Sequence, residues 1–167
     1  MSSKTKKIAL LGVITGVALV LSYLEAILPP LYPAIPGIKV GLPNIVIIFI
    51  LYKYGVKEAI TASLLRVFIV ALLFGNAMTL SYSLAGAVLS ILLMAIFKKI
   101  NIFSPIGVSI IGGVAHNLGQ IIVAIILLNS SLIAYYMIIL TFTGTLAGIF
   151  VGVAAALLLK RMNNLKL

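Results

Sequence analysis

The amino-acid sequence predicts an all-α membrane protein, a bundle of six transmembrane helices with both termini in the cytoplasm. Of the 167 residues, 63% are hydrophobic and only 8% are charged, and so few charges do not cover the surface of a soluble domain. The apolar residues fall into long runs separated by short polar gaps, as membrane spans do. Basic residues mark alternate gaps. We therefore expect a single integral membrane domain over residues 1–167, crossing a cell membrane several times.

The basic residues set the expected orientation. The chain has 12 of them, and most lie in gaps that the positive-inside rule assigns to the cytoplasm. These are Lys4, Lys6, Lys7, Lys53, Lys57, Lys98, Lys99, Lys160, Arg161 and Lys166. Two cations do not fit this pattern, Lys39 in the first gap and Arg66 inside the third run.

The runs place the helices, in chain order, at about residues 8–28, 44–54, 57–74, 80–97, 106–128 and 132–159. The first is too long for a cleaved signal peptide, and it ends in Glu25 and prolines. The second is shorter than the roughly 20 residues of a span, so we expect it to begin below the outer surface, with Asn44 after Pro43 as its N-cap. Glu58 begins the third, where a negative charge favours the helix dipole.

The first gap, residues 29–43, differs from the short connections elsewhere. It contains five of the 6 prolines in the chain. Proline blocks helix formation and removes a backbone donor. We expect a stiff, extended loop on the outer face.

Several function classes are excluded by composition. The net charge of +10 does not indicate nucleic-acid binding, because the cations sit at the ends of apolar runs without interleaved aromatic residues. There is no cysteine and no aspartate, and the side-chain carboxylates are Glu25 and Glu58. A P-loop, an aspartate-rich magnesium–diphosphate site and a Ser-His-Asp triad are all missing. One histidine supplies too few metal ligands. We expect no catalytic residue, no metal and no cofactor.

Two charged residues lie within the apolar runs, Arg66 and Glu25, and each needs a partner or a role. An arginine at a helix centre is costly in lipid and must face protein, water or a ligand. Arg66 therefore either pairs with Glu25 or backbone carbonyls, or contacts an anionic or polar ligand. Glu25, near the outer end of the first run, is either a solvated helix-end carboxylate, a partner for Arg66 or Lys39, or a ligand contact.

The fifth run carries three hydrogen-bonding side chains on one helix face, His116, Asn117 and Gln120, in line with Ser109 and Gly113. Such groups are expensive at mid-membrane depth unless they are used. They either hold neighbouring helices together or line a ligand pocket.

Small residues recur every four positions in two runs. The first run has Gly12 and Gly16, extended by Ala9, and the last has Gly144, Gly148 and Gly152. This spacing allows close helix approach. Either set packs inside the bundle or forms a groove for a partner.

Several short motifs, in this order and spacing, together resemble one bacterial family. They are Gly37-Ile38-Lys39-Val40-Gly41-Leu42-Pro43-Asn44, Leu64-Leu65-Arg66, Leu73-Phe74-Gly75-Asn76, Ser83-Leu84-Ala85-Gly86, Ser104-Pro105-Ile106-Gly107 and Ala115-His116-Asn117-Leu118-Gly119-Gln120. The family is called the Gx transporter family, and also heptaprenyl diphosphate synthase component I. It resembles the substrate-binding (S) components of energy-coupling factor (ECF) transporters, six-helix proteins that capture a micronutrient on the outer side of the membrane.

The resemblance implies a non-enzymatic role in uptake of a small polar or anionic nutrient or cofactor precursor. The expected ligand-binding residues are Glu25, Lys39, Asn44, Arg66, Asn76, His116, Asn117 and Gln120, with residues 29–43 as a lid. The resemblance also implies docking of the first helix, through Ala9, Gly12 and Gly16, onto a membrane coupling subunit that works with two ATPases. Two alternatives stay open: a non-catalytic membrane subunit of a heptaprenyl diphosphate synthase in quinone biosynthesis, and a membrane anchor of a redox complex.

Overall fold

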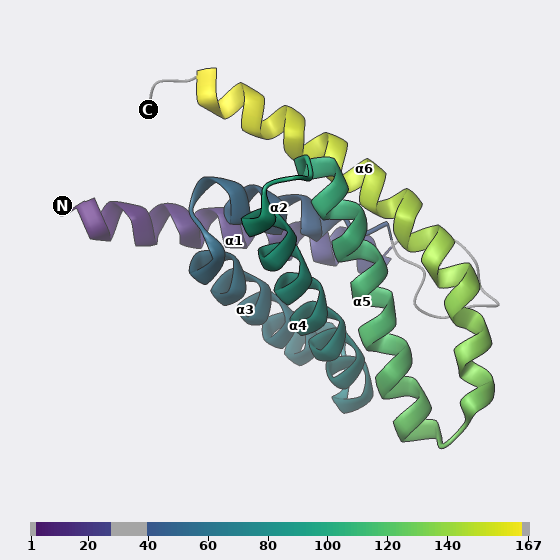
Figure 1. The fold of residues 1–167 in the computed structure, drawn as a ribbon. Coiled ribbons are helices and arrows are strands. Elements are labelled where there is room, and N and C mark those ends of the chain that lie inside the picture. Colours follow the sequence, from purple (N-terminus) through teal and green to yellow (C-terminus); the bar gives the residue numbers. More distant parts are fainter. Residues whose placement is uncertain (1–2, 28–39, 165–167) are drawn as a thin grey trace.

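The computed structural model describes residues 3–27 and 40–164 and folds them into six α-helices and one short 3-10 helix (Figure 1). They are α1 (Ser3–Ile27), α2 (Leu42–Lys53), α3 (Val56–Phe74), α4 (Ala77–Ile100), α5 (Pro105–Leu128), η1 (Ser131–Tyr135) and α6 (Tyr136–Asn164). Neither described range contains a strand. The predicted all-α fold with six α-helices is confirmed, and most helix ends lie within a few residues of those expected.

Four stretches are long and apolar enough to cross a membrane. They are Lys4–Ile27, Ala77–Ile100, Pro105–Leu128 and Ser131–Met162. The shortest of these have 24 residues, about 36 Å of helix, which exceeds the roughly 30 Å of a bilayer core. Large apolar side chains such as Ile8, Ile126 and Phe142 are exposed on them, as expected where lipid is the solvent. The protein is therefore a multi-pass membrane protein.

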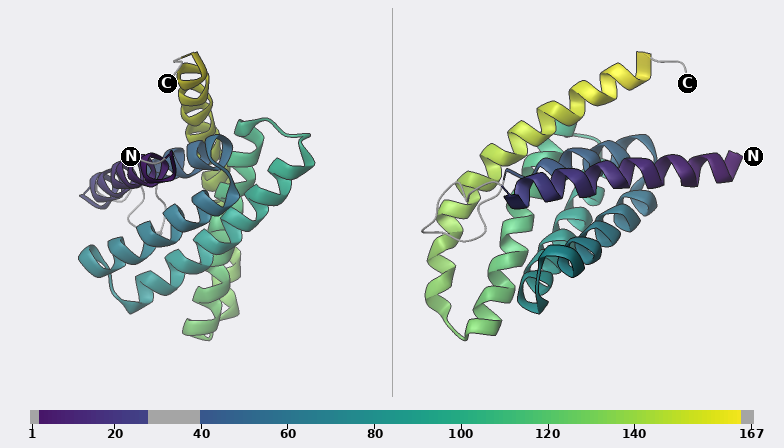
Figure 2. Two further views of the ribbon diagram at one scale, coloured as in Figure 1. Left: turned by 90° about the vertical axis from the view of Figure 1, so that its left-hand side faces the viewer. Right: turned by 180° about the vertical axis from the view of Figure 1, so that it is seen from behind.

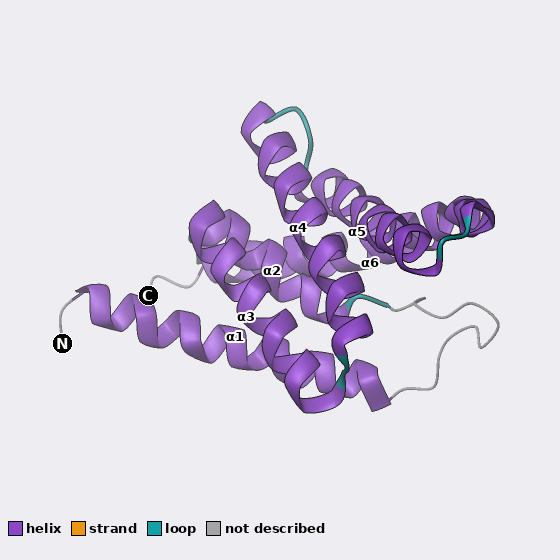
Figure 3. Cartoon of the chain, turned by 90° about the horizontal axis from the view of Figure 1, so that it is seen from below, coloured by secondary structure: helices purple, strands orange, loops and turns teal. Residues whose placement is uncertain are grey.

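The short helix α2 lies at the centre of the fold. It packs against α1, α3, α5 and α6, and Figure 3 shows it between α1 and the group formed by α4, α5 and α6. Its residues Val46 to Leu51 are all buried. A helix that is apolar all round is stable only inside a core or a membrane. With 12 residues, about 18 Å, α2 falls short of a full span, as the sequence predicted.

The predicted N-cap of α2 was wrong. The helix begins at Leu42, and its N-cap is Gly41, which has a φ of 80°. Asn44 lies inside the first turn. A proline has no N–H to leave unsatisfied and its φ suits the first turn, so the helix starts before Pro43. The left-handed backbone at residue 41 favours glycine.

The helices α4, α5 and α6 approach each other closely through glycines. A Cβ atom built on Gly119 of α5 would lie 2.6 Å from the carbonyl oxygen of Ala85 in α4. One built on Gly148 of α6 would lie 2.6 Å from the Cα of Ile110 in α5. Backbone this close excludes any larger side chain. The glycine repeat of α6 therefore packs inside the bundle.

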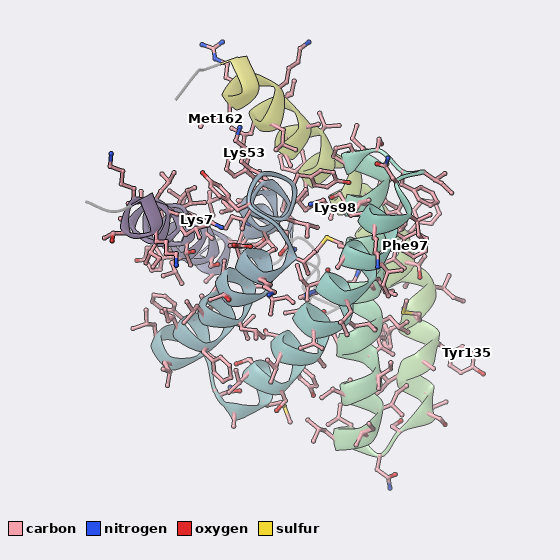
Figure 4. All side chains as sticks on the ribbon, turned by 60° about the vertical axis from the view of Figure 1, so that its left-hand side comes forward. Lys7, Lys53, Phe97, Lys98, Tyr135 and Met162 are labelled. Atoms are coloured by element: carbon pink, nitrogen blue, oxygen red, sulfur yellow. The ribbon has the colours of Figure 1, made fainter. Side chains whose placement is uncertain are left out.

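Basic residues gather at one end of the bundle, which we call the basic end. Figures 1 and 2 show the start of α1 and the end of α6 at this end, together with the α2–α3 turn. Two contacts hold it together: Lys7 forms a 2.5 Å ion pair with Glu58, and Lys98 Nζ donates to the carbonyl oxygen of Leu51 at 2.5 Å. Figure 4 shows Lys7, Lys53 and Lys98 toward the same end of the bundle, whereas Tyr135, the last residue of η1, projects outward. Glu58 lies in the first turn of α3, as predicted.

Candidate functional site

A cavity of about 200 Å³ lies among the six α-helices, in the half of the bundle away from the basic end. It is lined by the last turns of α1, the second half of α3, the first turns of α2 and α4, the middle of α5 and the first half of α6. Its polar side chains are Ser22, Glu25, Asn44, Arg66, Thr79, Ser83, His116, Asn117, Gln120 and Thr143. On α3, Val67, Val70 and Phe74 add an apolar wall. The cavity therefore combines hydrogen-bonding groups with an apolar side.

Six of the eight predicted ligand-binding residues line this cavity. They are Glu25, Asn44, Arg66, His116, Asn117 and Gln120. They come from α1, α2, α3 and α5, up to 95 positions apart in the chain (25 to 120). Lys39 and residues 29–39 of the expected lid lie outside the described residues.

Asn76 is predicted as a ligand contact but has a different place. Its side chain accepts a hydrogen bond from the Thr79 N–H at 2.9 Å, and the Thr79 hydroxyl accepts from the Asn76 N–H at 2.8 Å. This reciprocal capping box begins α4. The residue is exposed, and among the described residues its neighbours Gly75 and Thr79 line the cavity in its place.

Arg66 carries the positive charge of the cavity. It lies midway along α3, and its Nε is buried without a hydrogen-bond partner among the described residues. Placing an arginine at this depth costs roughly 2.5–3.5 kcal/mol on insertion scales, and a buried donor left unsatisfied adds to that cost. Arg66 thus lines the cavity and carries a donor that the described part of the protein does not use.

Glu25 is held by the N-terminus of α2. Its Oε1 accepts a hydrogen bond from the Gly41 N–H at 2.5 Å and a longer one from the Leu42 N–H at 3.4 Å. The first amides of a helix have no partner within it and carry the positive end of the helix dipole. A carboxylate from α1 therefore caps α2. Sequence analysis did not include this role for Glu25.

Arg66 and Glu25 share the cavity without forming a contact ion pair. In residues 3–27 and 40–164, the ion pair within 4.0 Å is the one between Lys7 and Glu58. The Glu25 carboxylate is hydrogen-bonded by backbone amides, whereas Arg66 lines the cavity with its Nε unpartnered among the described residues.

The polar side chains of α5 contact neighbouring helices as well as the cavity. Asn117 Nδ2 donates to the Leu140 carbonyl of α6 at 2.6 Å, so Asn117 joins two helices as well as lining the cavity. His116 fits against Gly86 of α4, where an added Cβ would lie 2.9 Å from the histidine Cε1. Because Gly86 has no side chain, there is space for the imidazole at the cavity wall.

The polar lining residues that sequence analysis missed are hydroxyl residues. Ser22, Thr79, Ser83 and Thr143 line the cavity. Ser22 Oγ donates to the Ala18 carbonyl at 2.8 Å, and Thr143 Oγ1 to the Leu140 carbonyl at 3.2 Å. Serine and threonine satisfy themselves in this way anywhere in a helix, so their presence in an apolar run does not distinguish a cavity wall from lipid-facing surface.

A second, smaller cavity of about 30 Å³ adjoins the first through Gly41, Asn44, Gly113 and Ala147. Ser109 lies on its wall, and the Ser109 Oγ is buried without a partner among the described residues. This volume is about that of one water molecule. It extends the polar stripe of α5 toward the basic end.

The predicted docking residues of α1 face outward. Ala9 and Gly12 are exposed and Gly16 is half-buried. A Cβ built on Gly12 or Gly16 would meet nothing within 4 Å. These glycines therefore do not serve packing within the described bundle, unlike those of α5 and α6.

Comparison with protein families identifies the group to which this fold and cavity belong. Residues 14–158 match the model of a family described as heptaprenyl diphosphate synthase component I. The chain belongs to this family. The matched range contains every residue that lines the cavity, and the family predicted from the sequence motifs is confirmed. No curated protein and no solved structure matches this family member.

Proposed function

We propose that this protein is the substrate-binding component of an ECF-type importer, which captures a small polar or anionic nutrient or cofactor precursor. One observation carries the proposal: a polar cavity inside a membrane bundle is lined by Arg66, whose buried Nε has no acceptor among the described residues. An intramembrane cation is expensive unless a counter-charge or polar ligand meets it. A ligand with a hydrogen-bond acceptor satisfies it.

The position of the cavity supports capture from outside the cell. The cavity lies in the half of the bundle opposite the basic end. By the positive-inside rule, the basic end with both termini faces the cytoplasm. In a bacterial cell membrane the cavity then lies in the outer half, where a solute arriving from outside reaches it first.

The outward-facing glycines of α1 support docking onto a partner. We propose that Ala9, Gly12 and Gly16 contact a membrane coupling subunit, and that two ATPases attached to that subunit supply the energy. Small residues let a partner helix approach closely, and the open space at Gly12 and Gly16 leaves room for it. In this arrangement the chain itself needs neither a catalytic residue nor a cofactor.

A second candidate function follows from the family description. It names a component of a heptaprenyl diphosphate synthase, so a role as a membrane subunit of that enzyme in quinone biosynthesis is the alternative. The chain has no aspartate with which to build a magnesium–diphosphate site, so in that role it is non-catalytic. A membrane anchor of a redox complex is a weaker alternative of the same kind.

Co-purification tests the proposal against both alternatives. We expect the tagged protein, extracted from its own membranes in mild detergent, to carry a coupling subunit and two ATPases, identified by mass spectrometry. The double variant Gly12→Leu with Gly16→Leu should recover about tenfold less of them, because its side chains hold a partner helix away. Its thermal unfolding should be unchanged, since a Cβ at either position meets nothing.

The matched control is Val13→Leu with Val17→Leu, which changes two exposed positions with the same spacing on α1 and leaves the glycines intact. Recovery of a soluble prenyl diphosphate synthase subunit in place of the ATPases would instead establish the enzyme role. Undiminished recovery with the glycine variant would place the docking surface elsewhere.

A further inference from the structure

The two charges in the cavity are not in equivalent states. Glu25 Oε1 already accepts hydrogen bonds from the Gly41 and Leu42 amides, at the positive end of the α2 dipole. Arg66 Nε has no acceptor in the described part of the chain. Arg66 is therefore the charged group of the cavity whose hydrogen-bonding capacity is left for a ligand.

We propose that the ligand is a small monocarboxylate, whose carboxylate binds the Arg66 guanidinium. This inference rests on the proposed capture function and narrows it to one substrate class. A guanidinium presents its donors as a planar fork that matches the two oxygens of a carboxylate. The pairing is strongest where water is excluded, as at a buried Nε.

Glu25 limits the negative charge that a ligand in the cavity can carry. Glu25 repels each negative charge that a ligand brings into the cavity, and like charges in a low-dielectric site repel strongly. Arg66 can offset one such charge and has no second cation beside it among the described lining residues. A cation would meet Arg66, and it could pair with Glu25 only in competition with the α2 amides. The cavity therefore selects a ligand with one negative charge over ligands with two or with a positive charge.

The wall of α3 orients the ligand. Arg66, Val70 and Phe74 are four residues apart and lie on one helix face, and all three line the cavity. Phe74 is at the end of α3, so the carboxylate enters first and the apolar body rests against Val70 and Phe74. On the opposite wall, His116 and Gln120 of α5 contact the polar groups of that body.

The volume limits the size of the ligand. The cavity measures about 200 Å³, and an engineered cavity of about 150 Å³ in another protein holds benzene. A ring of six atoms with one carboxylate and one or two further substituents fits, and a ligand with a long isoprenoid chain does not fit inside.

Four probes that share a phenyl ring and differ in charge test the charge class at pH 8: benzoate, benzamide, benzylamine and phenylphosphonate. With the full chain in detergent, ligand-detected NMR at millimolar concentration should show benzoate binding at least about tenfold more tightly than the other three. Arg66→Gln should reduce benzoate binding about tenfold and leave benzamide unchanged. Arg161→Gln, which removes an exposed cation at the basic end, is the control and should change nothing.

Glu25→Gln keeps an acceptor oxygen for the α2 amides and removes the negative charge. It should raise phenylphosphonate binding about tenfold at pH 8, where the phosphonate is a dianion, and should change benzamide binding little. Thermal unfolding of each variant confirms that it is folded.

Wild-type protein that binds benzamide or benzylamine as tightly as benzoate would overturn the monocarboxylate assignment, as would benzoate binding unaffected by Arg66→Gln. Binding of none of the four probes would overturn it too. These outcomes leave the capture function standing if the coupling subunit and ATPases still co-purify. Loss of that complex, with benzoate binding retained, would instead refute the importer and keep the ligand class.

Discussion

At the scale of single residues, Glu25 is the position that the structure redefined. From the sequence it is a carboxylate near a helix end, with Arg66, Lys39, solvent or a ligand as its partner. In the fold it caps α2 through the Gly41 and Leu42 amides. Charge-assisted hydrogen bonds of this kind contribute about 1.5–3 kcal/mol, so Glu25 stabilises the protein without any ligand, and Arg66 is left to the cavity.

This separation of roles makes a prediction for Arg66→Ala. The ligand-free variant should be as stable as the wild type or more stable, because a buried cation without an acceptor has been removed. Its affinity for the native ligand should fall by about 1.5–3 kcal/mol. Glu25→Gln should lower ligand-free stability by about 1 kcal/mol, because a neutral oxygen accepts weaker hydrogen bonds from the α2 amides.

Thermal unfolding of both single variants and of the double variant decides between this account and a structural Arg66–Glu25 pair. We expect the stability changes of the two single variants to add in the double variant. A large loss in Arg66→Ala that is restored by adding Glu25→Gln would show that the two side chains pair.

At the scale of elements, α2 has a charge from another helix at each end. Glu25 of α1 meets its N-terminus, and Lys98 of α4 donates to the Leu51 carbonyl at its C-terminus at 2.5 Å. The Lys98 ammonium also lies 5.1 Å from the centre of the Tyr52 ring. The signs match the helix dipole at both ends. Side chains of other helices thus satisfy two N–H groups at the start of this short, buried helix and one carbonyl near its end.

Lys98→Met should therefore destabilise the protein by about 1–2 kcal/mol, because it leaves a helix C-terminus without its cation and donor. Methionine keeps the length and apolar contacts of the side chain. The matched control is Lys99→Met, an exposed neighbour in the same last turn of α4, which should change stability by less than about 0.5 kcal/mol. Chemical or thermal unfolding in detergent measures both, and equal losses would refute the role of Lys98.

At the scale of the whole molecule, the basic end, with its ion pair, and the polar cavity lie in opposite halves of the bundle. The basic end contains most of the described cations and the Lys7–Glu58 ion pair, and the other half contains the cavity with Arg66. Glycine contacts pack α4, α5 and α6 closely, whereas α1 packs against α2 and α3 and leaves its glycines facing outward. The cavity and the outward-facing glycines are therefore two separate surfaces, which the proposed function assigns to a ligand and a partner.

Cysteine labelling tests the orientation of the whole bundle, and the chain has no native cysteine. Cells that carry Lys53→Cys or Lys99→Cys should react with a membrane-impermeant maleimide only after permeabilisation. Asn129→Cys, in the exposed α5–α6 connection, should react in intact cells, as should a cysteine within residues 30–42. The physical reason is the positive-inside rule. Labelling of residue 99 in intact cells would reverse the topology and put the cavity on the cytoplasmic side.

The sequence by itself determined the parts of this protein that depend on local composition. Apolar runs of sufficient length must form helices in lipid, because backbone groups have no other partner there. The number of α-helices, the shortness of α2 and the place of Glu58 followed from this. The six candidate residues that line the cavity were found because polar and charged side chains are rare inside apolar runs.

Tertiary structure decided what depends on the spatial relation of distant segments. Only the fold brings Gly41 back to Glu25, which makes Glu25 a helix cap, a role outside the alternatives that the sequence left open. The fold also starts α2 ahead of Asn44. Only the packing separates the glycines of α6, which touch backbone, from those of α1, which touch nothing. Motif spacing is the same in both helices, so the neighbours of a residue, and not its position in the sequence, decide its role.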